Sequence, residues 1–292
     1  MENNIFNQYQ LFITMHSINT KMEGLQSINT STRLNTRCRK NASVKGSVCE
    51  KCFAETYLNM RKHLNLNCEH NTQVLTDSII PMEYLPFINQ YVFRFESFGD
   101  LNNEIQFINY LNICYKNPQT TFAIWSKNPD IMDQVFNEMK YKKPNNLIIV
   151  ISSLFLNVEF KLENMPYSKR YWFIDKIFTV YTCEYAIKNN ININCGRKKC
   201  LNCKLCYSHN KVKIINEVLK SQQPLYYYIM DLLKDFKEYL KENEFKPNKE
   251  AINLYLSYIW YDILEEKNLD IKKAEKESKK IEKLLSKYIE VL

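Results

Sequence analysis

Four short apolar runs, separated by stretches of helical periodicity, limit the folds that this chain can adopt. The runs have the composition of strands and cover residues 91–95, 121–125, 147–151 and 177–181. The third run, LIIVI, is apolar on both faces, as strands are in a parallel sheet covered on both sides. Helical stretches at 101–117 and 129–141 lie between the runs. The alternation predicts an α/β fold whose architecture is a partial or full (β/α) barrel.

The composition changes after residue 209, where the chain becomes helical in its periodicity. Helices are expected over residues 211–221, 224–243 and 248–266, followed by a charged helix that reaches Leu292. Asn248, which follows a proline, is expected to start the third of these helices. The sequence therefore predicts a cysteine-rich barrel-like domain over residues 1–209 and a helical C-terminal region over residues 210–292.

Glycine is scarce, and its scarcity excludes the common nucleotide-binding loops. The chain has 292 residues and only four glycines, no three of which share a loop, so neither G-x-G-x-x-G nor a P-loop can form. No run of about 18 uncharged apolar residues is present, so we expect no membrane partner. The first ten residues lack the basic start and apolar stretch of a signal peptide, which predicts a cytoplasmic protein.

Ten cysteines are present, and seven of them fall in two tight groups. In a reducing compartment, grouped cysteines bind metal more often than they form disulfides. The later group has the spacing C-x4-C-x2-C-x2-C and consists of Cys195, Cys200, Cys203 and Cys206. Four thiolates suit Zn²⁺ or an iron–sulfur cluster, and one compact run favours the cluster because structural zinc sites usually draw two pairs from separate segments.

The earlier group, Cys38-x10-Cys49-x2-Cys52, offers three thiolates, which can hold a [4Fe–4S] cluster and leave one iron open. A helix is expected to start just after Cys52. Zinc is the alternative, because Cys49 and Cys52 together with Cys68 and His70 also give four ligands at plausible spacing.

Three stretches of this chain resemble the radical S-adenosylmethionine superfamily and, more closely, its uncharacterised phage-encoded relatives of the "gene product eighty-eight" type. The stretches are the cysteine loop ending in CEKCFA at residues 49–54, the strand and turn FRFESFGD at residues 93–100, and the late run from Cys195 to Cys206. The likeness covers about residues 25–207. The first cysteine gap is ten residues here, whereas the common superfamily spacing has three.

The resemblance implies a barrel of the radical S-adenosylmethionine type and a set of roles. Cys38, Cys49 and Cys52 would ligate a [4Fe–4S] cluster whose open iron chelates S-adenosylmethionine, and one electron would yield a 5′-deoxyadenosyl radical that abstracts hydrogen from an unknown substrate. The late cysteines would hold an auxiliary cluster. Residues at the ends of three successive strands would contact the cofactor: Glu96, Ser97, Gly99, Asp100, Ser126, Lys127, Ser152 and Ser153. The expected location is then the cytoplasm of the host cell.

Two other functions fit the same residues. Basic side chains crowd both cysteine groups and the net charge is +8, as in a zinc-stabilised protein that binds nucleic acid. A metal-bearing protein without catalysis, which binds a host protein through its helical tail, is the third interpretation. At the residue level, Asp100 also has an ordinary structural interpretation as the N-cap of a helix that begins at Leu101.

Overall fold

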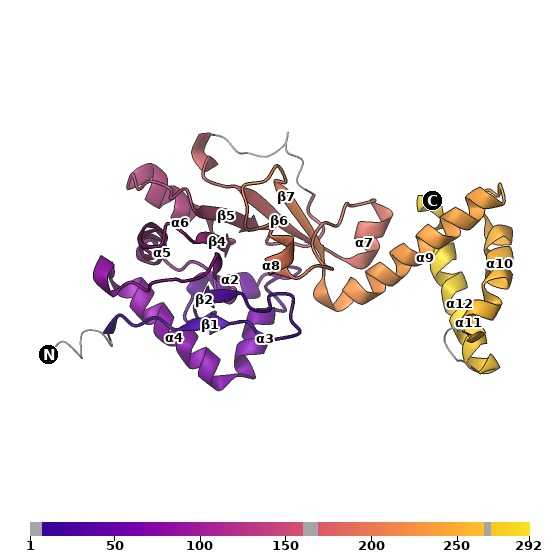
Figure 1. The fold of residues 1–292 in the computed structure, drawn as a ribbon, viewed down its shortest axis with the longest axis horizontal. Helices are drawn as coiled ribbons and strands as arrows, with labels where there is room; N and C mark the ends of the chain where they lie inside the picture. The colour runs from indigo at the N-terminus through magenta and orange to yellow at the C-terminus, as the bar shows by residue number, and fades with distance from the viewer. Residues whose placement is uncertain (1–7, 160–168, 266–269) are drawn as a thin grey trace. The chain divides into compact units, whose positions relative to one another are not determined.

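The computed structural model describes residues 8–159, 169–265 and 270–292, and it shows an α/β protein. Its mostly parallel seven-stranded sheet has the strands side by side in the order of the sequence (Figure 1). The first two strands pair antiparallel, and each pairing from the second strand to the sixth is parallel. The strands are β1 Ile13–Met15, β2 Gln26–Ile28, β3 Val92–Phe95, β4 Thr121–Ser126, β5 Leu147–Ser152, β6 Lys176–Tyr181 and β7 Ile214–Val218.

Helices connect the strands and follow them. Those up to residue 171 are α2 Thr36–Ala42, α3 Phe53–Asn59, α4 Lys62–Asp77, η1 Met82–Tyr84, α5 Glu104–Lys116, α6 Pro129–Asp133, the π-helical η2 Gln134–Glu138 and η4 Lys169–Tyr171. The later ones are α7 Cys183–Lys188, α8 Cys200–Cys203, η5 Lys220–Gln222, α9 Gln223–Glu242, α10 Lys249–Tyr258, α11 Trp260–Glu265, α12 Ile271–Tyr288 and η6 Ile289–Val291.

Both faces of the sheet are apolar. Successive side chains of a strand point to opposite faces, and the central strands have apolar residues at successive positions. On one face, Phe93, Phe122 and Leu147 share the main core with side chains of α4, α5, α6 and η2. On the other face, Val92 and Ile148 pack against Leu25 and Tyr207, and the cysteine-rich segment after Cys195 contributes to this second layer. The parallel strands are therefore covered on both sides, as their composition predicted.

The chain divides into two compact units. The first contains the residues up to Val180 together with Asn194–Glu217, and the second contains Tyr181–Ile193 together with Val218–Leu292. The second unit has its own core, to which α9 contributes a stripe at helical spacing: Tyr226, Ile229, Leu233, Phe236 and Leu240. No helix among the described residues is long and apolar enough to cross a membrane.

The four predicted central strands are confirmed, and so are the start of α3 directly after Cys52 and that of α10 directly after Asn248. The helix predicted over residues 211–221 is wrong, because residues 214–218 form β7 at the edge of β6. The β-branched Ile214, Ile215 and Val218 favour a strand, and pairing with β6 decides the outcome over the helix-like spacing. Glu266, at the end of another predicted helix, lies outside the described residues.

Candidate metal and cofactor site

The carboxyl ends of β2 and β3 meet at one edge of the sheet, and the first cysteine group begins there. After β2 the chain runs through Asn35, which caps α2: its Oδ1 accepts the N–H of Cys38 at 3.0 Å. The Nδ2 of Asn35 donates to the carbonyl oxygen of Asp100 at 2.9 Å and to that of Leu101 at 3.2 Å. One asparagine therefore fixes the start of the cysteine segment to the turn that follows β3.

The thiols of the first group are partly buried and lie within one electrostatic neighbourhood. Burial raises the pKa of the Cys38 thiol far above its ordinary value, the charges of Asp100 and Glu96 add to this effect, and Lys127 opposes it. Burial also raises the pKa of Cys49. The charge of Lys127 opposes this shift, and that of Cys52 adds to it. Cys49 thus lies within electrostatic range of both Cys38 and Cys52, and the charge of Asp100 in the turn after β3 acts on both Cys38 and Cys49.

This neighbourhood is not a finished coordination sphere. Among the residues that the structure describes, no three His, Cys, Asp or Glu side chains are gathered in an arrangement that could hold a metal ion as they stand. The donor set still suits an iron centre, because thiolates are its usual protein ligands and a lysine beside them offsets negative charge. Metal binding would have to draw the three thiols closer together.

Glu96 is the most constrained residue of the turn after β3. Its φ of 58° is in the left-handed region, and its carboxylate is buried. It accepts hydrogen bonds from the Tyr110 hydroxyl at 2.6 Å, Gln106 Nε2 at 2.7 Å and Thr30 Oγ1 at 2.9 Å. Burial raises the pKa of Glu96 to about 8, although the hydrogen bonds from Tyr110 and Thr30 oppose the shift. The side chain points into the protein, where it joins β2, β3 and α5.

Gly99 lets the same turn close around this carboxylate. Its φ is +90°, and an added Cβ would lie 2.4 Å from Thr30 Oγ1 and 2.5 Å from Glu96 Oε2. Because both the backbone conformation and the space exclude a side chain, only glycine fits.

Asp100 joins the ends of β3 and β4. Its Oδ1 accepts the Ser126 hydroxyl at 2.5 Å and the Leu101 N–H at 2.8 Å, and its Oδ2 accepts the Lys127 N–H at 3.0 Å. The interpretation of Asp100 as a helix N-cap is wrong, because α5 starts at Glu104 and is capped by Asn103. Leu101 and Asn102 lie outside the helix, and Asp100 instead binds the end of the neighbouring strand.

The other predicted cofactor residues also lie at strand ends. The hydroxyl of Ser97 lies 3.1 Å from His16 Nε2. Ser152 ends β5, and the next residue, Ser153, donates its hydroxyl to the Phe155 carbonyl at 2.8 Å. The first cysteine loop reaches the same place, because Val48 N donates to the Leu154 carbonyl at 2.9 Å. Asp100 after β3 and Leu154 after β5 therefore contact the segment that carries Cys38, Cys49 and Cys52, and the charge of Lys127 after β4 acts on Cys38 and Cys49.

The second cysteine group lies against the sheet face opposite the main helical core. Cys200 and Cys206 pack beside Trp125 and Tyr207 there. Burial raises the pKa of Cys206 far above its ordinary value; the other three thiols of the group act in the same direction, and the guanidinium of Arg94 opposes them. Arg94 stacks on Trp125, 3.8 Å from the ring centre. These four thiols also share one neighbourhood.

Lys21 is the second cation of this neighbourhood. Its Nζ donates to Cys195 Sγ at 3.0 Å and to Glu217 Oε1 at 2.5 Å. Burial lowers the pKa of Lys21, but Glu217 and Cys195 reverse the effect, so its pKa rises overall. Burial raises the pKa of Cys195 to about 11, with Glu217 adding to the shift and Lys21 opposing it.

The remaining ligands of the zinc alternative are engaged elsewhere. Cys68 is fully buried on α4 in a small cluster with Leu58 and Phe98, and the charges that act on its thiol are those of Glu96 and Glu69. The Nε2 of His70 lies 2.9 Å from the carbonyl oxygen of Gln10. The structure does not group these two residues with Cys49 and Cys52.

Sequence reasoning missed the residues that organise the site. Thr30, Gln106 and Tyr110 surround Glu96, Asn35 ties α2 to Asp100, and Lys21 reaches Cys195 from far away in the chain. The sequence did hold one signal for the residues around Glu96. Gln106 and Tyr110 are four residues apart, so on a helix they lie on the same face and can reach one common partner.

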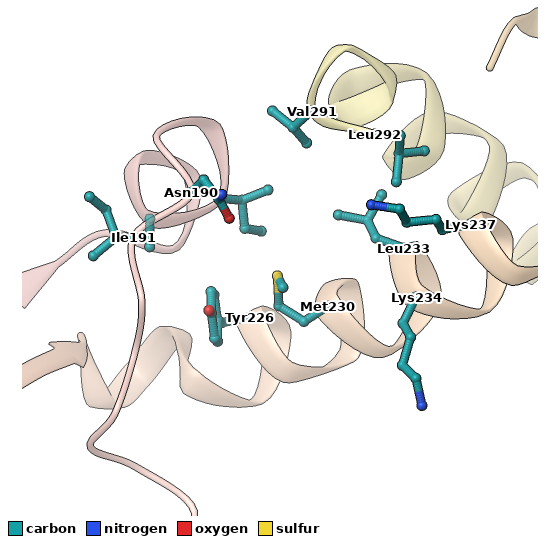
Figure 2. A pocket seen from close by; sticks show the side chains of 11 residues that line it. Asn190, Ile191, Tyr226, Met230, Leu233, Lys234, Lys237, Val291 and Leu292 are labelled. Carbon is teal, nitrogen blue, oxygen red and sulfur yellow. The ribbon is translucent and has the colours of Figure 1, made fainter. Parts of the chain in front are cut away.

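The second unit contains a hollow of about 250 Å³ between α7, α9 and the C-terminal end (Figure 2). Tyr226, Met230 and Leu233 form one wall; of the two lysines that also line it, Lys237 extends toward the hollow and Lys234 points away from it. It contains no cysteine and no residue that the sequence predicted for a site.

No protein-family model matches the chain, and neither a curated protein nor a solved structure matches it.

Proposed function

We propose that this chain is an iron–sulfur protein of the radical S-adenosylmethionine type, similar to the phage-encoded relatives named above, which modifies an as yet unidentified substrate. Cys38, Cys49 and Cys52 would hold the [4Fe–4S] cluster that binds S-adenosylmethionine, and Cys195 to Cys206 an auxiliary cluster. The observation that carries the proposal is the link through Asn35, which accepts the N–H of Cys38 and donates to the Asp100 carbonyl, so that the first cysteine group begins beside the Glu96–Asp100 turn.

The order of elements supports this proposal. β2 precedes the first cysteine group, and β3 leads directly into the Glu96–Asp100 turn. The parallel strands β2 to β6 are neighbours in sequence order. Right-handed connections between strands in that order put all the connecting helices on one face, which is the arrangement of a barrel wall. We therefore propose that the sheet is the wall of a partial barrel whose opposite face is covered by the late cysteine segment.

The chain's own residues would have separate tasks. When bound, the cluster supplies the electron that cleaves S-adenosylmethionine to 5′-deoxyadenosyl radical and methionine. Ser97 and Asp100 would accept hydrogen bonds from the cofactor's ammonium group, and Lys127 would offset the charge of the thiolates. Glu96 would hold the turn in place, because its carboxylate oxygens already accept three side-chain hydrogen bonds. Sites at the carboxyl ends of barrel strands commonly position cofactors in this way.

Metal content tests the first half of the proposal. We expect the anaerobically purified full chain to bind iron and sulfide and to absorb broadly near 400 nm. Cys38→Ala/Cys49→Ala/Cys52→Ala should lose the first cluster and keep the auxiliary one. The variant with alanine at all four cysteines of the late group should lose the auxiliary cluster and keep the first. Cys114→Ala, which removes a buried thiol outside both groups, is the control and should keep both clusters. Colourless protein with stoichiometric zinc would contradict the proposal.

Cofactor cleavage tests the second half. With dithionite and S-adenosylmethionine under anaerobic conditions, the chain that carries its iron–sulfur clusters should form 5′-deoxyadenosine. The triple variant of the first group should form none, while Cys114→Ala should match the natural chain. Clusters without any cleavage would show a metal-bearing protein that lacks this chemistry.

A further inference from the structure

We infer that the proposed active site acts on a single-stranded nucleic acid, which binds along a basic segment, residues 33–62, that we call the basic rim. The inference rests on the proposed function for the reaction and names its substrate class. Four independent properties of the basic rim carry it: charge, freedom from ion pairs, position and an exposed aromatic ring.

The basic rim holds most of the net charge of the chain. It contains eight basic side chains and only two acidic ones, Glu50 and Glu55, so it has a net charge of +6 out of +8 for the whole protein. The basic residues are Arg33, Arg37, Arg39, Lys40, Lys45, Lys51, Arg61 and Lys62. Positive charge at this density attracts the phosphates of a nucleic acid and releases their counterions.

The basic rim is exposed, and its charges are almost entirely unpaired. Within the described ranges, only Arg37 of the eight lies within 4.0 Å of a carboxylate, at 3.7 Å from Asp130. The other seven basic side chains are exposed. On α12, by comparison, ion pairs are present for three of the seven lysines within the described ranges, Lys273, Lys280 and Lys287. The basic rim therefore has cations available for an anionic partner.

The position of the basic rim connects it with the proposed site. It carries Cys38, Cys49 and Cys52 and passes along the loops that follow three successive strands. Asn35 bonds to Asp100 after β3, Arg37 pairs with Asp130 after β4, and Ser47 forms a β-bridge with Phe155 after β5. A polyanion bound to these cations would consequently lie across the opening of the site.

Phe53 favours a single strand over other polyanions. It follows Cys52 directly and is 52% exposed. Its ring lies 5.6 Å from Tyr57, whose ring stacks on buried Phe98 at 5.1 Å and also lies under Arg61 at 4.2 Å. A supported and exposed ring beside cations is the usual platform for an unpaired base. Neither a lipid headgroup nor an acidic protein requires such a ring.

Binding to a labelled RNA tests the inference. The probe is a fluorescein-labelled RNA of about 20 nucleotides and mixed sequence, followed by anisotropy with the anaerobically prepared full chain at several salt concentrations. Arg39→Glu/Lys40→Glu/Lys45→Glu should weaken binding at least tenfold and reduce the slope of log K against log salt by about 2, since each lost phosphate contact on a single strand removes about 0.7. The control is Lys276→Glu/Lys279→Glu/Lys283→Glu on α12, which changes the charge equally and should change binding less than twofold.

A second pair of variants tests the aromatic ring without changing the charge. Phe53→Ala should weaken binding about fivefold, which corresponds to the lower end of the stacking contribution of one base. Leu66→Ala, which removes an equally exposed apolar side chain on α4, should leave binding unchanged. A duplex of the same length should bind more weakly than the single strand.

Several results would overturn the inference: equal effects of the two triple variants, equal or tighter binding of the duplex, or binding to phosphatidylserine vesicles that excludes the RNA. Iron content and 5′-deoxyadenosine formation, measured on the same preparations, separate the two proposals. Normal clusters and cleavage without RNA binding would contradict only the substrate class. RNA binding by protein that takes up no iron would contradict only the enzyme.

Discussion

Glu96 shows how much a single side chain of the candidate site depends on its surroundings. The resemblance to the radical S-adenosylmethionine superfamily implied that Glu96, Ser97, Gly99 and Asp100 are all cofactor contacts. The structure instead buries its carboxylate among Thr30, Gln106 and Tyr110, which come from a different loop and from α5. That enclosure has a measurable consequence for stability, because it changes the pKa of the acid.

We predict that Glu96 makes the protein less stable as pH rises. Its folded pKa of about 8 exceeds the ordinary value of 4.5, so between these values the folded chain keeps a proton that the unfolded chain has released. The free energy of unfolding should therefore fall with rising pH in this window, by up to about 1.4 kcal/mol per pH unit. Urea unfolding at pH 5, 6, 7 and 8 measures this slope.

The matched variant is Glu96→Gln, which keeps the shape of the side chain and cannot ionise. Its stability relative to the natural chain should increase from pH 5 to pH 8, because only the natural chain loses stability through this group. Parallel curves for the two proteins would show that the carboxyl group titrates normally.

The turn itself gives a second prediction. Gly99→Ala should lower the free energy of unfolding by about 2 kcal/mol or more, because the substitution combines a left-handed backbone with a collision at Thr30. Gly46→Ala is the control, because its φ is also positive, at +78°, but nothing lies within 4 Å of the added Cβ. It should cost only about 1 kcal/mol, the strain alone. Equal losses in the two variants would mean that the contact with Thr30 has no effect.

At the scale of elements, the sequence predicted those whose pattern is local. β4 and β5 are apolar runs, and α5 has helical spacing, so each was recognisable on its own. β2 was missed because it has only three residues, QSI, and only its pairing with β3 makes it a strand. β7 was misread for the same reason, since its partner β6 lies more than thirty residues earlier in the chain.

The residues of the candidate site also divide into those with a local sequence pattern and those that depend on distant segments. The cysteine groups could be recognised from spacing, because chain neighbours stay close in space, and the strand-end residues were proposed from the resemblance alone. The contacts between Lys21, Cys195 and Glu217 could not, since the three residues come from distant segments. Only the folded chain brings them together.

This link between elements gives a third prediction. Lys21→Met should lower the free energy of unfolding by about 3 kcal/mol, because it removes a largely buried ammonium group that donates to both Cys195 and Glu217. Lys21→Met/Glu217→Gln should recover part of that loss, since the neutral glutamine does not depend on the lost ammonium group. Urea unfolding of the three proteins at pH 7 measures both effects. Additive losses in the double variant would show that the two side chains do not interact.

At the scale of the molecule, each of the two units has a separate hydrophobic core. We therefore predict two transitions in urea unfolding. Ile149→Ala in the first core and Leu285→Ala in the second should each lower the midpoint of a different transition, with a cost of about 3 kcal/mol each. Tryptophan fluorescence and circular dichroism can follow both transitions. A single transition that both variants shift equally would mean that the units unfold together.

The path of the chain between the two units restricts where it can be cut. Residues 181–193 leave the first unit, residues 194–217 return to it with the late cysteines and most of β7, and the rest of the chain leaves again. Truncation after residue 209, where the composition changes, would remove β7, expose the hydrogen-bonding edge of β6 and delete Glu217, the ion-pair partner of Lys21. A shortened protein intended to keep the sheet and both cysteine groups has to extend at least to residue 218.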